Sequence, residues 1–207
     1  MTKINKNIIR AVTVVLVLIF ILGLTSCTKK LSEDEAIAKV SELIDASYEL
    51  NEIVFGKGLE YIETEESKNT KYALVKENDK YNSINDIKQE IYKVFSEQYT
   101  ITLENTAFKG QSGAIDGTRV PARYIENSQG FLVLKEKTVH EDENEDDKLN
   151  DGYYSIEVLK YDTSTIEIKK ISRRFIEAYI TSVDGNETIL VTLILEENGW
   201  RIDSPTY

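Results

Sequence analysis

Cysteine and histidine, the side chains on which nucleophilic and zinc chemistry most often depends, are almost absent from this sequence. The 207 residues include one cysteine, Cys27, and one histidine, His140. A single cysteine excludes a disulfide bond within the chain, and the two residues together are too few for the usual four-ligand zinc sites. Proline is also scarce: Pro121 and Pro205 both fall near expected strand ends, where a missing N–H donor is tolerated.

Basic residues are outnumbered as well. The chain has 25 Lys and Arg against 36 Asp and Glu, which gives a formal net charge of −11. Binding to nucleic acid requires a basic surface, so we expect no nucleic-acid partner. The hydrophobic fraction of 41% is high enough to form a core, which excludes a wholly disordered chain.

The N-terminal segment has the pattern of an export signal. Three basic residues precede a run from Ala11 to Leu22 in which Thr13 alone is polar. Twelve residues are too few to span a bilayer, which takes about 20, but they suit the apolar region of a signal peptide. We therefore expect a signal peptide over residues 1–26. An uncleaved membrane anchor followed by a chance cysteine is the alternative.

The signal ends in Leu24-Thr25-Ser26-Cys27, which resembles the lipobox of bacterial lipoproteins. The resemblance implies cleavage between Ser26 and Cys27 and attachment of a diacylglyceryl group to the Cys27 thiol. Residues 27–31 would then be the lipidated cysteine and a short tether. The mature chain would have 22 basic and 36 acidic residues, a net charge of −14, and would lie on the extracytoplasmic face of the cell membrane.

Two helices are expected next. Ser32 and Glu35 have the spacing of a capping box, and apolar residues at helical spacing follow them, so a helix is predicted over about residues 33–53. A second helix is predicted from Ser83 to about Tyr99, and should end before the β-branched residues that begin at Thr100.

The remaining chain has the alternating pattern of strands and the turn residues of hairpins. The segment Ile189–Leu195 is apolar on both faces except at Thr192, which predicts a central strand. Short strands or extended segments are expected at 59–62 and 72–75. Strands are expected at 120–124, 131–134, 153–161, 165–171, 174–183, 187–196 and 200–203. This order predicts one α+β domain over residues 32–207, with two N-terminal helices packed on a curved antiparallel sheet.

The order of elements resembles the cystatin-like and NTF2-like superfold. Residues 36–100 also resemble secreted Gram-positive inhibitors of DL-endopeptidases, through the helix at Tyr48, Gly56 and Gly58, Tyr72 and the segment from Ser83 to Thr100. The ending Gly199–Tyr207 resembles the closing strand of clostridial lipoproteins. These resemblances imply a membrane-anchored, non-catalytic binding protein that modulates or inhibits a cell-wall enzyme. A small-ligand-binding or enzymatic NTF2-like domain, with a cavity between helices and sheet, is the alternative.

No catalytic motif stands out. His140 opens an acidic loop, 141–151, that lacks the glycine of an EF-hand, so a mobile charged loop is favoured there over a calcium site. Glu157, Glu167 and Glu177 occupy strand positions expected to face water. The Gly56/Gly58 pair follows a helix and is interpreted as its C-terminal turn. We therefore expect no catalytic residue, metal or cofactor, and as partners the membrane, through Cys27, and a basic envelope protein.

Overall fold

The computed structural model describes residues 29–65, 67–112, 119–135 and 156–207. Residues Leu31–Tyr207 form one compact unit, and the account below concerns that unit. The predicted signal peptide, with Ser26 and Cys27, lies outside the described residues. So do His140, the acidic loop 141–151 and the first part of the strand expected at 153–161.

The first helix, α2 (Glu33–Val54), has the predicted start. The Ser32 hydroxyl accepts a hydrogen bond from the Glu35 backbone, and the Glu35 carboxylate accepts one from Ser32 N at 2.7 Å. This reciprocal box satisfies two N–H groups that the helix leaves unpaired. The apolar side of α2, from Ala36 and Val40 to Leu50, is buried in the main hydrophobic cluster.

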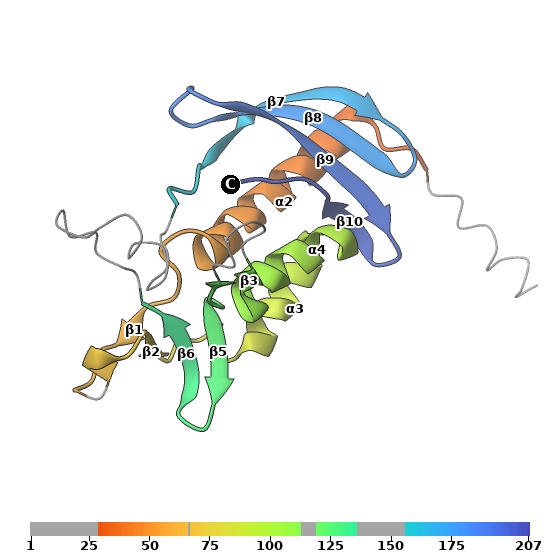
Figure 1. The fold of residues 1–207 in the computed structure, drawn as a ribbon. Helices are drawn as coiled ribbons and strands as arrows, with labels where there is room; N and C mark the ends of the chain where they lie inside the picture. The colour runs from red at the N-terminus through yellow and green to blue at the C-terminus, as the bar shows by residue number, and fades with distance from the viewer. Residues whose placement is uncertain (1–28, 66, 113–118, 136–155) are drawn as a thin grey trace, which may run out of the picture. The chain divides into compact units, whose positions relative to one another are not determined.

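A four-stranded antiparallel sheet packs on α2 (Figure 1). Its strands follow the chain order, β7 (Tyr161–Ile171), β8 (Phe175–Ser182), β9 (Thr188–Glu196) and β10 (Gly199–Ile202). The inward side chains of β8 and β9 alternate with outward ones and join the same hydrophobic cluster as α2. As predicted, β9 is an interior strand, and the hairpin at Asp184-Gly185-Asn186 joins β8 to it.

A second four-stranded sheet has the order β1 (Tyr61–Ile62), β2 (Tyr72–Val75), β6 (Gly130–Leu134), β5 (Tyr124–Asn127). Its central pair joins distant segments, because Tyr72 lies opposite Leu134. The predicted hairpin of β5 and β6 is confirmed. A short ladder joins β3 (Gln111–Ser112) to β4 (Arg119–Val120), and the single-turn helix η1 (Ser67–Asn69) lies between β1 and β2.

The predicted end of the second helix, at about Tyr99, is wrong. Helix α3 (Ile84–Val94) stops at Phe95, and a new helix, α4 (Glu97–Glu104), begins after Ser96 and runs into a π-helical turn, η2 (Asn105–Lys109). Residues Thr100–Leu103, predicted to leave the helix, belong to α4. The interruption has a long-range cause: Phe95 forms a bridge to Ile202, and Ser96 N donates to the Ile202 carbonyl at 2.8 Å.

The strands predicted at 153–161 and 165–171 are also different in the structure. One continuous strand, β7, begins at Tyr161 and runs through to Ile171 with two irregularities in its pairing with β8. The chain is thus α+β, as predicted, with three α-helices and two four-stranded antiparallel sheets among the described residues, in place of one curved sheet. Helix α2 packs on β7 and β10, whereas α3 contacts α2, β10 and β5.

Candidate functional site

A cleft with a volume of about 420 Å³ lies on the outer face of the β1-β2-β6-β5 sheet. Its floor is apolar: Leu74 lies opposite Leu132, and Leu132 lies opposite Ile125 on the next strand. Leu74 is 38% exposed although it is in the middle of a sheet. An apolar floor with an exposed leucine side chain is a surface that another molecule can cover.

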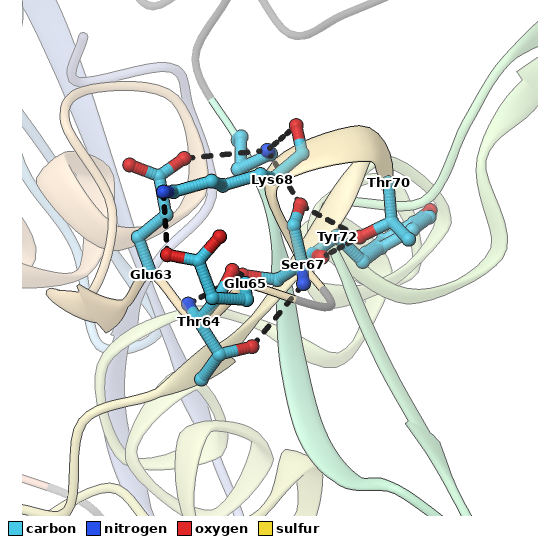
Figure 2. A network of polar contacts seen from close by, with 8 residues as sticks. Glu63, Thr64, Glu65, Ser67, Lys68, Thr70 and Tyr72 are labelled. Atoms are coloured by element: carbon cyan, nitrogen blue, oxygen red, sulfur yellow. Dashed lines mark hydrogen bonds and ion pairs between the residues drawn. The ribbon is translucent and has the colours of Figure 1, made fainter.

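One wall of this cleft is a turn held by hydroxyl groups. Thr64 N donates to the Ser67 hydroxyl at 2.8 Å, and Ser67 N donates to the Thr64 hydroxyl at 3.2 Å. The Thr70 hydroxyl contacts the carbonyl oxygens of Ser67 and Tyr72. Figure 2 shows these groups turned toward one another beside Tyr72. Their shared bonds fix the wall, so the cleft exists before anything binds.

Lys135, the residue after β6, connects this turn to the sheet through its side-chain contacts. Its ammonium group donates to the Ser67 carbonyl at 2.9 Å and lies 3.6 Å from the Glu63 carboxylate. The Lys135 side chain is largely buried, with 17% exposed. The cation therefore stabilises the turn rather than lining the cleft.

The opposite wall is the β5–β6 hairpin, which presents the amides of Asn127 and Gln129. The Asn127 side-chain oxygen accepts a hydrogen bond from Gln129 N at 2.8 Å. The NH₂ group of the Asn127 side chain takes no part in this bond. Gly130 has φ +121°, and a Cβ there would lie 3.0 Å from a Leu74 methyl group. Glycine thus serves both the turn and the close approach of Leu74.

None of the described residues that line the cleft has a carboxylate or an ammonium group. Burial raises the pKa of Tyr72, and its hydroxyl donates to the Ala122 carbonyl at 2.6 Å, so it stays protonated at neutral pH. What remains is a set of hydroxyl and amide groups over aliphatic side chains, which suits a neutral polar ligand with an apolar part. The lining residues are Thr64, Ser67, Thr70, Tyr72, Leu74, Ile125, Asn127, Gln129 and Leu132.

A smaller cavity of about 220 Å³ lies between α2 and the start of β7. Here the Lys160 ammonium lies 5.8 Å from the centre of the Tyr48 ring, and Asp45 also lines the space. Tyr161 is 5% exposed, and its pKa is raised by burial and by the Glu187 carboxylate. This cavity is the place in the structure that corresponds to the expected space between helices and sheet.

The turn after α2 involves a buried arginine that the sequence analysis did not identify. Arg123 is 2% exposed, and its guanidinium donates to the Gly56 carbonyl at 2.6 Å. The Tyr124 hydroxyl donates to the Ile53 carbonyl and accepts from Leu59 N. The Gly56/Gly58 pair is therefore a helix C-terminal turn, as predicted, and is packed against β5.

The three glutamates considered earlier are not brought together. Glu157 and Glu167 are exposed, and Glu177 lies 3.5 Å from the Lys169 ammonium. In the part of the chain that the structure describes, no three His, Cys, Asp or Glu side chains are close enough to hold a metal. The cleft residues were missed as a site because hydroxyl and amide residues in turns have no distinctive sequence pattern.

Comparison of the chain with protein-family models gives no match, and comparison with curated proteins gives none either. Within the described ranges, no helix is both long and apolar enough to cross a membrane.

Proposed function

We propose that the protein is a lipoprotein anchored through Cys27 to the extracytoplasmic face of the cell membrane, where it binds an envelope protein without catalysing a reaction. The partner class that we favour is a cell-wall enzyme that the lipoprotein modulates or inhibits. The lipobox at residues 24–27 supports the location at the membrane, and the cleft over Leu74 supports the binding function.

The cleft is the observation that carries the binding function. Its walls are fixed by internal hydrogen bonds, and Leu74 and Ile125 offer apolar area at its floor. A segment with an apolar side chain and unpaired backbone amide groups would match this lining. The net charge of −14 on the mature chain complements a basic partner and would speed their encounter.

The finer fold assignment belongs to the same proposal. Helix α2 packed on the sequential meander β7-β8-β9-β10 supports a relationship to the cystatin-like and NTF2-like superfold. Helices α3 and α4 and the β1-β2-β6-β5 sheet would then be additions between the first helix and the meander. Members of one superfold differ in function, so this relationship alone favours no activity.

The second candidate is a small-ligand or enzymatic role for the cavity between α2 and β7. Asp45, Lys160 and Tyr161 would supply its ionisable groups. Its volume of about 220 Å³ is below the roughly 300 Å³ typical of small-molecule sites, which is why we favour the larger cleft.

Affinity capture of the lipidated protein from its own envelope tests the binding proposal. Leu74→Lys places a charge on the floor of the cleft, and Leu190→Lys is its matched control, because Leu190 is also a strand leucine with 38% exposure but lies in β9 of the other sheet. We expect Leu74→Lys to lower recovery of the partner about tenfold, whereas Leu190→Lys leaves it unchanged. Equal recovery with both variants would contradict a role for the cleft.

A further inference from the structure

We propose that the turn between β7 and β8 rests on anionic lipid headgroups and holds the domain in one orientation at the membrane. This inference depends on the proposed lipid anchor at Cys27. It assigns a second membrane contact to a surface that lies far from Cys27 in the sequence and outside the cleft.

The last residues of β7 and the turn after them contain the densest group of positive charge in an acidic protein. Lys169, Lys170, Arg173 and Arg174 are four cations within six residues, and no acid interrupts them. All four side chains are exposed. Ser172 fixes the turn between them, because its hydroxyl accepts hydrogen bonds from Arg174 N and from Phe175 N. The cations are therefore displayed from a rigid hairpin end.

Three of these cations have no carboxylate partner among the described residues. Lys170 lies over the Phe175 ring at 4.7 Å, and Arg173 and Arg174 make no ion pair, whereas Lys169 lies 3.5 Å from Glu177. Most of the other lysines in the described ranges are paired with an acid. Those pairs join Lys39 to Glu42, Lys68 to Glu65, Lys76 to Glu60, Lys80 to Glu49, Lys88 and Lys109 to Glu104, Lys93 to Glu90 and Lys135 to Glu63. Lys170, Arg173 and Arg174 are thus three cations without an ion pair within five residues.

The turn lies at the end of the domain from which the anchor leaves. The start of β7 meets the later part of α2, where Lys160 lies over Tyr48. From there β7 runs back along α2, so that its end and the turn lie toward the first residues of the helix (Figure 1). Four residues separate Cys27 from Ser32, which keeps the start of α2 within about 18 Å of the lipidated residue. A bilayer that holds Cys27 is therefore within reach of the turn.

Acidic groups also lie at this end of the domain. Glu33 and Asp34 are exposed at the start of α2 and are matched in number by Lys29 and Lys30 of the tether, and Glu35 is engaged in the capping box. Glu196 and Glu197 lie beside the turn, and the Glu196 carboxylate accepts a hydrogen bond from Glu97 N. None of these described acids forms an ion pair with Lys170, Arg173 or Arg174, and each Lys or Arg close to an anionic bilayer favours the bound state by about fivefold. Salt should weaken this contact, because it is electrostatic.

Fluorescence quenching in vesicles tests the orientation. Cys27 is the only cysteine, and its lipidation blocks its thiol, so one introduced cysteine can be labelled selectively. Asn198→Cys lies beside the turn, since Leu195 N donates to the Arg174 carbonyl, and Val183→Cys lies at the opposite end of the same sheet, about 30 Å away along β9. The lipidated protein is reconstituted into phosphatidylcholine vesicles, with or without phosphatidylglycerol, that contain a spin-labelled lipid.

With phosphatidylglycerol we expect the label at position 198 to be quenched at least about twofold more than the label at position 183. Arg173→Glu with Arg174→Glu should abolish the difference. Lys93→Glu with Lys109→Glu makes the same change in net charge on exposed helix positions and should preserve it.

Equal quenching of the two labels in protein that floats with the vesicles overturns the inference and leaves the anchor intact. An undiminished difference in phosphatidylcholine alone, or after the Arg173/Arg174 reversal, also overturns it. Protein that does not float, and whose Cys27 thiol reacts with the dye, overturns the anchor and the inference with it.

Discussion

At the scale of single residues, the buried side chain of Arg123 packs so closely against Gly58 that only glycine fits there. Gly58 has φ +78°, and a Cβ there would lie 2.3 Å from the Arg123 Nη2 atom. Gly58→Ala must therefore displace a buried guanidinium, and we expect it to lower the free energy of unfolding by about 3 kcal/mol. Gly185→Ala is the control, because Gly185 has φ +75° and no atom within 4 Å, so only backbone strain of about 1 kcal/mol is expected. Urea unfolding measures both, and equal losses would refute the packing argument.

The contribution of Asp86 to folding stability should depend on pH. Its carboxylate accepts from Asn82 N at 2.9 Å, and this bond, together with the Ser83 hydroxyl, lowers its pKa. Because the folded pKa lies below the unfolded value, the stabilisation is present above about pH 4 and is lost as the pH falls through the folded pKa. Asp86→Asn should cost about 0.5 kcal/mol at pH 7 and nothing near pH 2, measured by urea unfolding at each pH. A pH-independent cost would contradict an ionic role.

At the scale of elements, Ser96 decides where α3 ends and α4 begins. It is fully buried, its hydroxyl accepts from Tyr99 N at 3.0 Å and donates to Asp203, and its N–H donates to Ile202. Ser96→Ala should cost about 2 kcal/mol, because it removes a helix cap and the hydroxyl that donates to Asp203, whereas the backbone bond to Ile202 remains. Ser83→Ala removes the cap of α3 and the hydroxyl beside the Asp86 carboxylate, and should cost about 1 kcal/mol. Comparable costs for the two variants would show that the bond to Asp203 contributes little.

Elements with local causes were predictable, and those with distant causes were not. The start of α2 follows from Ser32 and Glu35, and the β8–β9 hairpin follows from its turn residues. The break at Phe95 depends on Ile202, a residue more than a hundred positions away, and the periodicity of the α3 sequence contains no trace of it. The continuity of β7 likewise depends on pairing with β8, which outweighs the polar residues in the middle of the strand.

The candidate site shows the same division. The sequence analysis considered single catalytic or metal-binding residues, whereas the cleft arises only when β2 pairs with β6 and brings Leu74 opposite Leu132. Its hydroxyl residues look like ordinary turn residues along the chain. The basic turn at 169–174 could have been found, because four cations in six residues stand out in an acidic sequence.

For the molecule as a whole, the α+β class followed from the order of helices and strands, but the division into two sheets did not. In the sequence, strands β1 and β2 precede α3 and α4, and strands β5 and β6 follow them. The pairing of β2 with β6 joins the two halves into one sheet. Sequence periodicity shows that a segment is a strand and which face it buries. It contains no information on which other strand becomes the neighbour, because that depends on packing across the whole chain.

The anchoring of the whole molecule gives the last prediction. In the proposed anchor the Cys27 thiol accepts the diacylglyceryl group, and the chain has no second cysteine to replace it, so Cys27→Ala should block lipidation. Since cleavage at a lipobox follows lipidation, the variant should retain its 26-residue signal or be cut elsewhere and released. Stability in urea should not change, because the capping box begins five residues later, at Ser32. Membrane fractionation with a labelled fatty-acid analogue measures the outcome. Equal labelling of the wild type and the variant, or no labelling of the wild type, would rule out the lipoprotein assignment.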